Sequence, residues 1–233
     1  MKNVAFISGT SKGIGKSIAE LLLSKKYIVY GYSRNNTINH KNFIFLKTDF
    51  YDVKKIEHFE FPQIEKITKV LLINNAATIG EIRPLGKRDN TQISEEINLN
   101  LISPTILCNQ LIKQYPNTEK LIINISSGAA KNAIPSWSTY CITKSGLDML
   151  SVTLKEENHK NLCVFSVSPG VVNTNMQLEI RNSDKNLFPL HQKFVDYFNN
   201  KELLSPKSVS LKIYKIIENS DNFSSTIVSL RDF

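Results

Sequence analysis

Short runs of apolar residues alternate along the chain with longer stretches in which apolar positions recur at helical spacing. Within the short runs polar and apolar residues do not alternate, which is typical of strands that are covered on both faces. The runs predict seven strands, at 4–7, 28–32, 43–46, 70–73, 121–125, 163–167 and 226–230. Helices are predicted between them at 14–23, 93–115, 139–157 and 206–217. This order predicts an α/β fold of the Rossmann type, a doubly wound parallel sheet of about seven strands with helices on both faces.

Length and composition fit one domain. Of the 233 residues, 41% are hydrophobic and 21% are charged, which argues against collagen, long coiled coils and disorder. No apolar run reaches the about 18 residues of a membrane-spanning helix, and the apolar start is too short for a signal peptide. Cys108, Cys141 and Cys163 are too scattered for a disulfide framework. We therefore expect a single cytoplasmic domain over residues 1–233, without a membrane partner.

Basic residues are in excess, with 29 Lys and Arg against 21 Asp and Glu and a net charge of +8. This charge would attract either a nucleic acid or a small phosphate-bearing cofactor. The lysines are spread over the whole chain and form no basic run of five, so no nucleic-acid partner is expected. No metal site is expected either, because the histidines lie far apart without metal-ligand spacing, at His40, His58, His159 and His191.

A glycine-rich loop at residues 8–15 follows the first predicted strand and opens the first predicted helix. It contains Gly9, Gly13 and Gly15. Glycine permits a tight turn and a close approach of the backbone to a phosphate, and the helix N-terminus supplies amide donors. A plain turn between strand and helix is the alternative, but the position favours a nucleotide-binding loop.

The end of the second predicted strand indicates which dinucleotide is bound. An acidic residue there would bind the ribose 2′-hydroxyl of NAD, whereas an arginine accommodates the 2′-phosphate of NADP. Here the strand ends in Ser33 and Arg34, and no carboxylate is near. Lys12 in the glycine loop offers a second cation for the same phosphate. The sequence therefore favours NADP(H).

Three residues suggest acid–base chemistry. Tyr140 and Lys144 lie four apart in a predicted helix, so their side chains share one face. The lysine ammonium is expected to lower the pKa of the tyrosine toward neutrality, because an opposite charge stabilises the phenolate. Ser127 follows the fifth predicted strand, at the sheet edge where ligands bind, and can donate to a substrate carbonyl. From position alone, the adjacent Ser126 remains the competing choice.

Taken together, these motifs resemble those of the short-chain dehydrogenase/reductase family. The family's glycine motif, its Asn-Asn-Ala-Gly stretch, its Ser–Tyr–Lys set, its helix asparagine and its Pro-Gly segment all have counterparts in the same order. They match Gly9, Gly13 and Gly15, then 74–77, then Ser127, Tyr140 and Lys144, with Asn100 and 169–174. The resemblance covers roughly residues 4–176.

The family's spacing between serine and tyrosine selects Ser127 over Ser126, because Tyr140 lies thirteen residues after Ser127. Two departures are visible, Ser8 in place of a threonine and Ala77 in place of a glycine. Neither removes a catalytic group.

The resemblance implies hydride transfer from a reduced nicotinamide to a carbonyl. Ser127 and Tyr140 would hold the carbonyl oxygen, and Tyr140 would protonate it with the support of Lys144. Asn100 would hold a water that links Lys144 to solvent. The implied cofactor-binding residues are Gly9, Ser11, Lys12, Gly13, Ile14, Gly15, Ser33, Arg34, Asp49, Asn75, Ala76, Tyr140, Lys144, Pro169, Val172 and Thr174.

Within the family, residues 125–132, 137–141, 169–177 and 203–206 resemble bacterial sepiapterin-reductase-like enzymes, which include benzil reductases. This implies NADPH-dependent reduction of a ketone, either an aromatic 1,2-diketone or a pterin side-chain ketone. Sepiapterin reductases hold the pterin with a carboxylate near the C-terminus, and the nearest counterpart, Asp232, is out of register by one residue.

Residues 175–205 are expected to form a substrate lid. Its aromatic side chains would stack on a flat substrate or else pack the lid internally; they are Phe188, Phe194, Tyr197 and Phe198. Trp137, three residues before Tyr140, would form a wall of the same pocket.

Other interpretations remain. A 3-oxoacyl carrier-protein reductase would suit the basic surface, and a non-catalytic NADP(H)-binding regulator would retain the glycine loop. The regulator is disfavoured because Tyr140 and Lys144 are both present. The resemblance further implies a homodimer or homotetramer, paired through the helices at 93–115 and 139–157.

Overall fold

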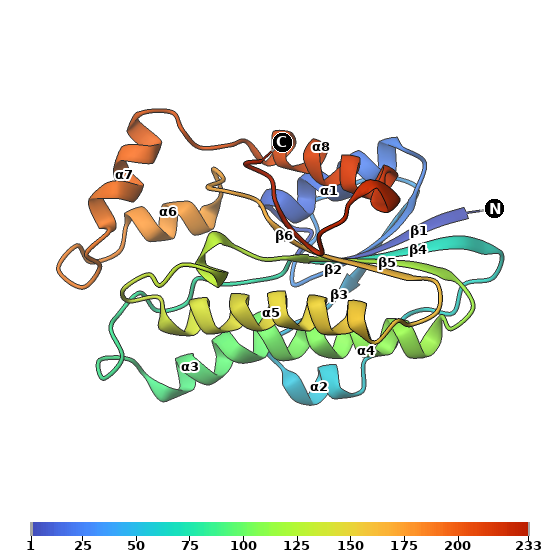
Figure 1. The fold of residues 1–233 in the computed structure, drawn as a ribbon, viewed down its shortest axis with the longest axis horizontal. Coiled ribbons are helices and arrows are strands. Elements are labelled where there is room, and N and C mark those ends of the chain that lie inside the picture. Colours follow the sequence, from blue (N-terminus) through green and yellow to red (C-terminus); the bar gives the residue numbers. More distant parts are fainter. Residues whose placement is uncertain (1, 233) are drawn as a thin grey trace.

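The computed structural model describes residues 2–232, and its centre is one seven-stranded sheet (Figure 1). Neighbouring strands are parallel throughout, in the order β3-β2-β1-β4-β5-β6-β7. The strands are β1 (Lys2–Ser8), β2 (Ile28–Ser33), β3 (Phe43–Lys47), β4 (Ile67–Asn74), β5 (Glu119–Ile125), β6 (Leu162–Ser168) and β7 (Ile227–Ser229). The chain therefore has the predicted doubly wound α/β fold, and the strand order reverses between β1 and β4.

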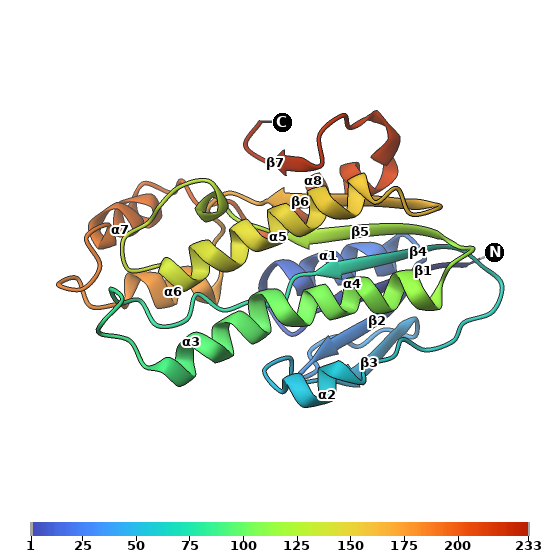
Figure 2. The same ribbon diagram turned by 60° about the horizontal axis from the view of Figure 1, so that its bottom comes forward.

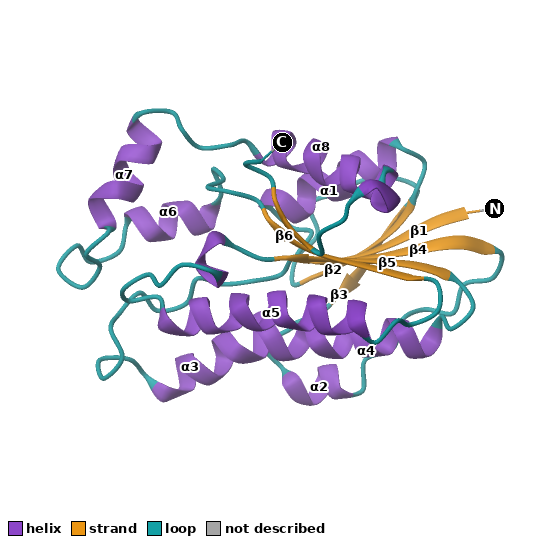
Figure 3. Ribbon diagram, in the orientation of Figure 1, coloured by secondary structure: helices purple, strands orange, loops and turns teal. Residues whose placement is uncertain are grey.

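Helices cover both faces of the sheet, as Figures 1 and 3 show. One face carries α1 (Gly13–Ser24) and α8 (Pro206–Glu218), and the other carries α2 (Val53–Glu57), α3 (Asn90–Ile97), α4 (Ser103–Gln114) and α5 (Ser138–Glu156). Strand β1 serves both sides, since Ala5 and Ile7 pack in one core cluster while Val4 and Phe6 pack in the other. All four side chains are fully buried, which explains the unbroken apolar run in the sequence.

The helix predicted at 93–115 is interrupted. Helices α3 and α4 form one rod beside α5 (Figure 2), joined by a π-helical turn at Asn98–Ile102. At its end the amide of Ser103 donates to the carbonyl of Asn98, five residues back. Pro104 follows, and a proline has no N–H for the carbonyl of Asn100, four residues before it. The sequence pattern did not reveal this widened turn.

Two further helices lie beyond the carboxyl ends of the strands (Figure 1). They are α6 (Asn175–Arg181) and α7 (His191–Asn199), both within the expected lid. A parallel bridge between Val172 and Leu204 closes the base of this segment. The amide of Asn173 donates to the carbonyl of Leu204 at 2.9 Å, and the amide of Leu204 donates to Val171 at the same distance. The two ends of the segment are thus held to each other.

Within residues 2–232, no helix is long and apolar enough to cross a membrane. Over the same residues, no group of three or more His, Cys, Asp or Glu side chains is arranged to hold a metal ion.

Candidate active site

A cavity of about 800 Å³ opens at the carboxyl ends of the strands, between the glycine loop and α6 and α7. Sheets of this type bind ligands where the strand order reverses, and the loops after β1 and β4 both line the cavity. Every site residue expected from the sequence lines it except Gly15 and Asn100. The structure thus brings together residues from positions 9 to 174 of the chain.

The glycine loop is shaped as the nucleotide-binding interpretation requires. Gly9 and Gly13 have φ angles of +77° and +60°, a conformation that other residues rarely adopt. At Gly15 a Cβ atom would overlap the carbonyl oxygen of Gly9 and the side-chain amide of Asn75, so this glycine serves packing behind the cavity wall. Lys12 precedes α1 and provides no side-chain cap, which leaves the first-turn amides to face a phosphate.

Ser8 connects the ends of β1 and β4. Its hydroxyl oxygen accepts hydrogen bonds from the amides of Asn75 at 2.9 Å and Ala76 at 3.0 Å. The side-chain amide of Asn75 donates back to the carbonyls of Ser8 at 3.0 Å and Gly9 at 3.1 Å. These bonds hold the glycine loop against the loop after β4. The hydroxyl, which the departure from threonine retains, is the group that makes them.

Arg34 and Lys12 are exposed at one end of the cavity. The guanidinium carbon of Arg34 lies 5.7 Å from the centre of the Tyr51 ring. Asp49 also lines this end, and its carboxylate accepts a hydrogen bond from the amide of Tyr51 at 3.1 Å. Between Arg34 and Asp49 the chain contains no acidic residue. Two exposed cations, Lys12 and Arg34, thus line the cavity together with the carboxylate of Asp49.

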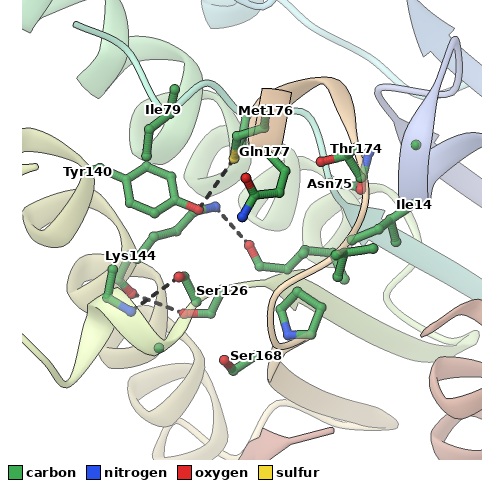
Figure 4. A pocket seen from close by; sticks show the side chains of 18 of the residues that line it. Ile14, Asn75, Ile79, Ser126, Tyr140, Lys144, Ser168, Thr174, Met176 and Gln177 are labelled. Atoms are coloured by element: carbon green, nitrogen blue, oxygen red, sulfur yellow. Dashed lines mark hydrogen bonds between the residues drawn. The ribbon is translucent and has the colours of Figure 1, made fainter. Parts of the chain in front are cut away.

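Tyr140 lies in the first turn of α5 with its hydroxyl in the cavity (Figure 4). That hydroxyl is 3.9 Å from the sulfur of Met176 in α6. Burial raises the pKa of Tyr140 to about 12, and a hydrogen bond with Ser127 acts in the opposite direction. The hydroxyl of Ser126 instead donates to the carbonyl of Lys144 at 3.4 Å. Ser127 is therefore the serine that meets the tyrosine.

Lys144 lies on the same face of α5, one turn after Tyr140. Its ammonium donates to the carbonyl of Ile125 at 2.8 Å and lies 5.6 Å from the centre of the Tyr140 ring (Figure 4). Burial lowers the pKa of Lys144 to about 8, and the charge of Asp148 opposes this shift. The expectation that Lys144 lowers the pKa of Tyr140 is wrong for this structure, because the cost of burying a phenolate dominates.

Asn100 lies behind the cavity wall and is 1% exposed. Its side-chain oxygen accepts from the amide of Thr78 at 2.9 Å, and its side-chain nitrogen donates to the carbonyl of Thr78 at 2.8 Å. The same nitrogen is 3.4 Å from the hydroxyl of Thr143, in the turn between Tyr140 and Lys144. The side chain of Asn100 thus holds the loop after β4 against α5.

The lid aromatics mostly pack with one another. Trp137 and Phe188 stack with their ring centres 5.4 Å apart, and Phe194 lies 5.1 Å from Trp137. Phe188 is fully buried and does not line the cavity, whereas Trp137, Phe194 and Tyr197 do. Phe198 is exposed outside it, beneath the guanidinium of Arg181. The prediction that the lid aromatics stack on a substrate is therefore wrong for Phe188 and Phe198.

Sequence reasoning did not single out several polar residues that line the cavity, among them Asp148 and Gln177. Asp148 lies one helical turn beyond Lys144, a spacing that could have indicated it, and it accepts from the hydroxyl of Ser166 at 2.6 Å. Gln177 is 3% exposed in α6, and the resemblance over residues 169–177 includes it without assigning it a role.

Comparisons with known proteins show the family to which the chain belongs. The short chain dehydrogenase family model matches residues 3–185, and the chain belongs to that family. It is 32% identical over 234 aligned positions to benzil reductase ((S)-benzoin forming) of Bacillus cereus, with 92% of this chain and 94% of that protein covered. It is 25% identical to sepiapterin reductase of Bos taurus, with 96% and 92% covered.

The fold is shared with a short chain dehydrogenase/reductase from Saccharomyces cerevisiae of known structure. The TM-score is 0.80 at 21% identity, with 98% of this chain and 96% of that chain covered. The protein is therefore an oxidoreductase of a family that uses a nicotinamide cofactor.

Proposed function

We propose that the protein is an NADPH-dependent carbonyl reductase whose substrates are aromatic 1,2-diketones. The observation that carries the proposal is the convergence of Ser127, Tyr140 and Lys144 in one cavity with the glycine loop. The relatives named benzil reductase support the diketone as the substrate class.

The residues present fit a nicotinamide dinucleotide, since the glycine loop and the uncapped first turn of α1 form a cradle for its phosphates. When bound, the reduced nicotinamide supplies the hydride. Lys12 and Arg34 would hold the 2′-phosphate, which distinguishes NADPH from NADH. Asp49 would contact the adenine, Asn75 and Ala76 the adenosine ribose, and Pro169, Val172 and Thr174 the nicotinamide end.

Tyr140 is the proposed acid. Its raised pKa keeps the phenol protonated near neutrality, as a proton donor must be. The hydroxyls of Ser127 and Tyr140 would donate to the substrate carbonyl oxygen, and Tyr140 would then release its proton to the developing alkoxide. The ammonium of Lys144 would stabilise the phenolate that remains. Asn100 would hold the relay water at its main-chain carbonyl, toward which Pro104 has no N–H to donate.

A pterin ketone is the less favoured substrate. Asp232, the nearest counterpart of the pterin-binding carboxylate, is exposed and does not line the cavity. The cavity wall includes aromatic and aliphatic side chains, among them Trp137, Phe194 and Ile180, which suit a flat apolar substrate.

The proposed location is the cytoplasm, and the proposed oligomeric state is a homodimer or homotetramer. Ile142 and Met149, seven residues apart on α5, are 58% and 65% exposed. Two large apolar side chains on one exposed helix face favour a contact between copies of the chain. The measured mass in solution tests this.

Oxidation of NADPH by the purified protein tests the function. Benzil, sepiapterin and an acetoacetyl thioester should be compared, each with NADPH and with NADH. We expect benzil with NADPH to turn over fastest and Tyr140→Phe to lower this rate by about 100-fold or more. Full activity in Tyr140→Phe, or turnover confined to the thioester, would contradict the proposal.

A further inference from the structure

Gln177 has an unsatisfied hydrogen-bond donor inside the candidate active site. Its side chain lines the cavity, is 3% exposed, and its amide nitrogen has no hydrogen-bond partner. Figure 4 shows the amide beside Met176 and turned toward the end of the Tyr140 side chain. A buried N–H without a partner costs free energy, so such a group is expected to meet an acceptor in the working complex.

The orientation of this amide is fixed by its other end. Its oxygen accepts a hydrogen bond from the guanidinium of Arg181 at 3.3 Å, one helical turn further along α6. An arginine side chain has donors and no acceptor, so the amide oxygen must face Arg181 and the NH₂ group must face the cavity. Arg181 is held in turn, because its guanidinium carbon lies 4.0 Å from the centre of the Phe198 ring.

The unsatisfied donor lies on the α6 side of the proposed acid (Figure 4). Met176, the neighbour of Gln177 in α6, is 3.9 Å from the Tyr140 hydroxyl. A carbonyl oxygen held by Ser127 and Tyr140 would therefore place the adjacent carbon of the substrate toward α6. An acceptor on that carbon is the chemistry that an amide N–H recognises.

We propose that Gln177 determines specificity by donating a hydrogen bond to a second oxygen on the carbon next to the reacting carbonyl. The site would then select 1,2-dicarbonyl compounds over simple ketones of the same shape. This inference rests on the proposed function and deepens it. The second oxygen is bound and not reduced, so Gln177 takes no part in hydride or proton transfer.

Benzil and deoxybenzoin provide the test, because they share both phenyl rings and deoxybenzoin has CH₂ in place of one carbonyl. In Gln177→Met, which keeps the length of the side chain and removes the donor, kcat/KM for benzil should fall by about 10-fold or more. For deoxybenzoin the value should stay within about twofold of the wild type, since that substrate never used the donor. The affinity for NADPH, measured by titration calorimetry, should not change.

Gln192→Met is the matched control, because Gln192 is an exposed glutamine of α7 that pairs with Asp196. Gln192→Met should leave kcat/KM unchanged for both benzil and deoxybenzoin. If Gln177→Met does not fold, Gln177→Leu removes the N–H as well without adding a charge, and should show the same selective loss.

Equal losses for both ketones, no loss for benzil, or a weaker affinity for NADPH would each overturn the assignment of Gln177 and leave the proposed function standing. A wild-type protein that reduces neither ketone would overturn the proposed function, and the inference would fall with it.

Discussion

Arg88 and Glu96 form an ion pair whose side chains are 1% and 2% exposed. The carboxylate also accepts from the amide of Glu81 at 2.7 Å, and the guanidinium also donates to the hydroxyl of Thr139. Thr139 directly precedes Tyr140 in α5. The pair therefore links the loop after β4 and helix α3 to the turn that carries the proposed acid. Burial raises the pKa of Glu96, and the charge of Arg88 opposes this shift.

Removing Arg88 should strongly destabilise the protein. Arg88→Met leaves a buried carboxylate without its partner, which typically costs about 3–5 kcal/mol of unfolding free energy. Urea denaturation measures this loss of unfolding free energy. Arg83→Met is the control: Arg83 pairs with Glu81 at the surface, where such a pair contributes about 1 kcal/mol or less. Equal losses in the two variants would show that the buried pair does not stabilise the fold.

The sheet could be predicted because the sequence carries a strong signal for it. Strands covered on both faces are predominantly apolar, and each of the seven runs lies at the position of an observed strand. The runs at 70–73 and 226–230 differ from the observed strands by only a few residues at their ends. The π-helical turn at Asn98–Ile102 could not be predicted, because its apolar residues continue the helical spacing.

The site was only partly predictable. Short motifs carry backbone requirements, so the glycine loop and the pair Tyr140 and Lys144 could be located from sequence. Gln177 and the pair of Arg88 with Glu96 depend on which long side chains meet in the folded chain, and local spacing does not determine that. The shift in the pKa of Tyr140 could not be predicted either, since its direction depends on how deeply the folded chain buries the side chain.

The buried ammonium of Lys144 should make stability depend on pH. Its pKa falls from 10.5 in the unfolded chain to about 8 in the folded one, so between these values the unfolded state binds more protons. The contribution of Lys144 to the free energy of unfolding should therefore rise with pH from about 8 and level off near 10.5. The raised pKa of Tyr140 acts oppositely above pH 10, its usual value.

Urea denaturation of the cofactor-free protein between pH 8 and pH 10, compared between the wild type and Lys144→Met, isolates the lysine contribution, because other buried groups such as the thiol of Cys108, whose pKa burial raises to about 12, titrate equally in both proteins. The rise should be smaller in Lys144→Met than in the wild type, because that variant has no ammonium to lose. Identical pH dependence in both proteins would show that Lys144 titrates normally.

Reversing the charge of Arg34 should reverse the choice of cofactor. In Arg34→Asp the 2′-phosphate of NADPH would meet a carboxylate, while the ribose hydroxyl of NADH would gain an acceptor. The ratio of kcat/KM for NADPH to that for NADH should fall by about 10- to 100-fold, since one charge-assisted hydrogen bond is lost. Lys41→Asp makes the same charge change outside the cavity lining and should leave the ratio unaltered. A wild-type protein that already prefers NADH would contradict the role of Arg34.

Two phenylalanines of the lid should respond differently to truncation. Phe188 is fully buried and stacks on Trp137, so Phe188→Ala should cost about 3–5 kcal/mol of unfolding free energy through the cavity it leaves. Phe198 is 46% exposed and its ring contacts the guanidinium of Arg181, so Phe198→Ala should cost about 1 kcal/mol or less. Urea denaturation compares the two variants. The ring centres of Trp137 and Tyr140 lie 5.7 Å apart, so Phe188→Ala should also lower kcat. A Phe188→Ala variant that is destabilised yet fully active would show that the aromatic cluster does not position the tyrosine.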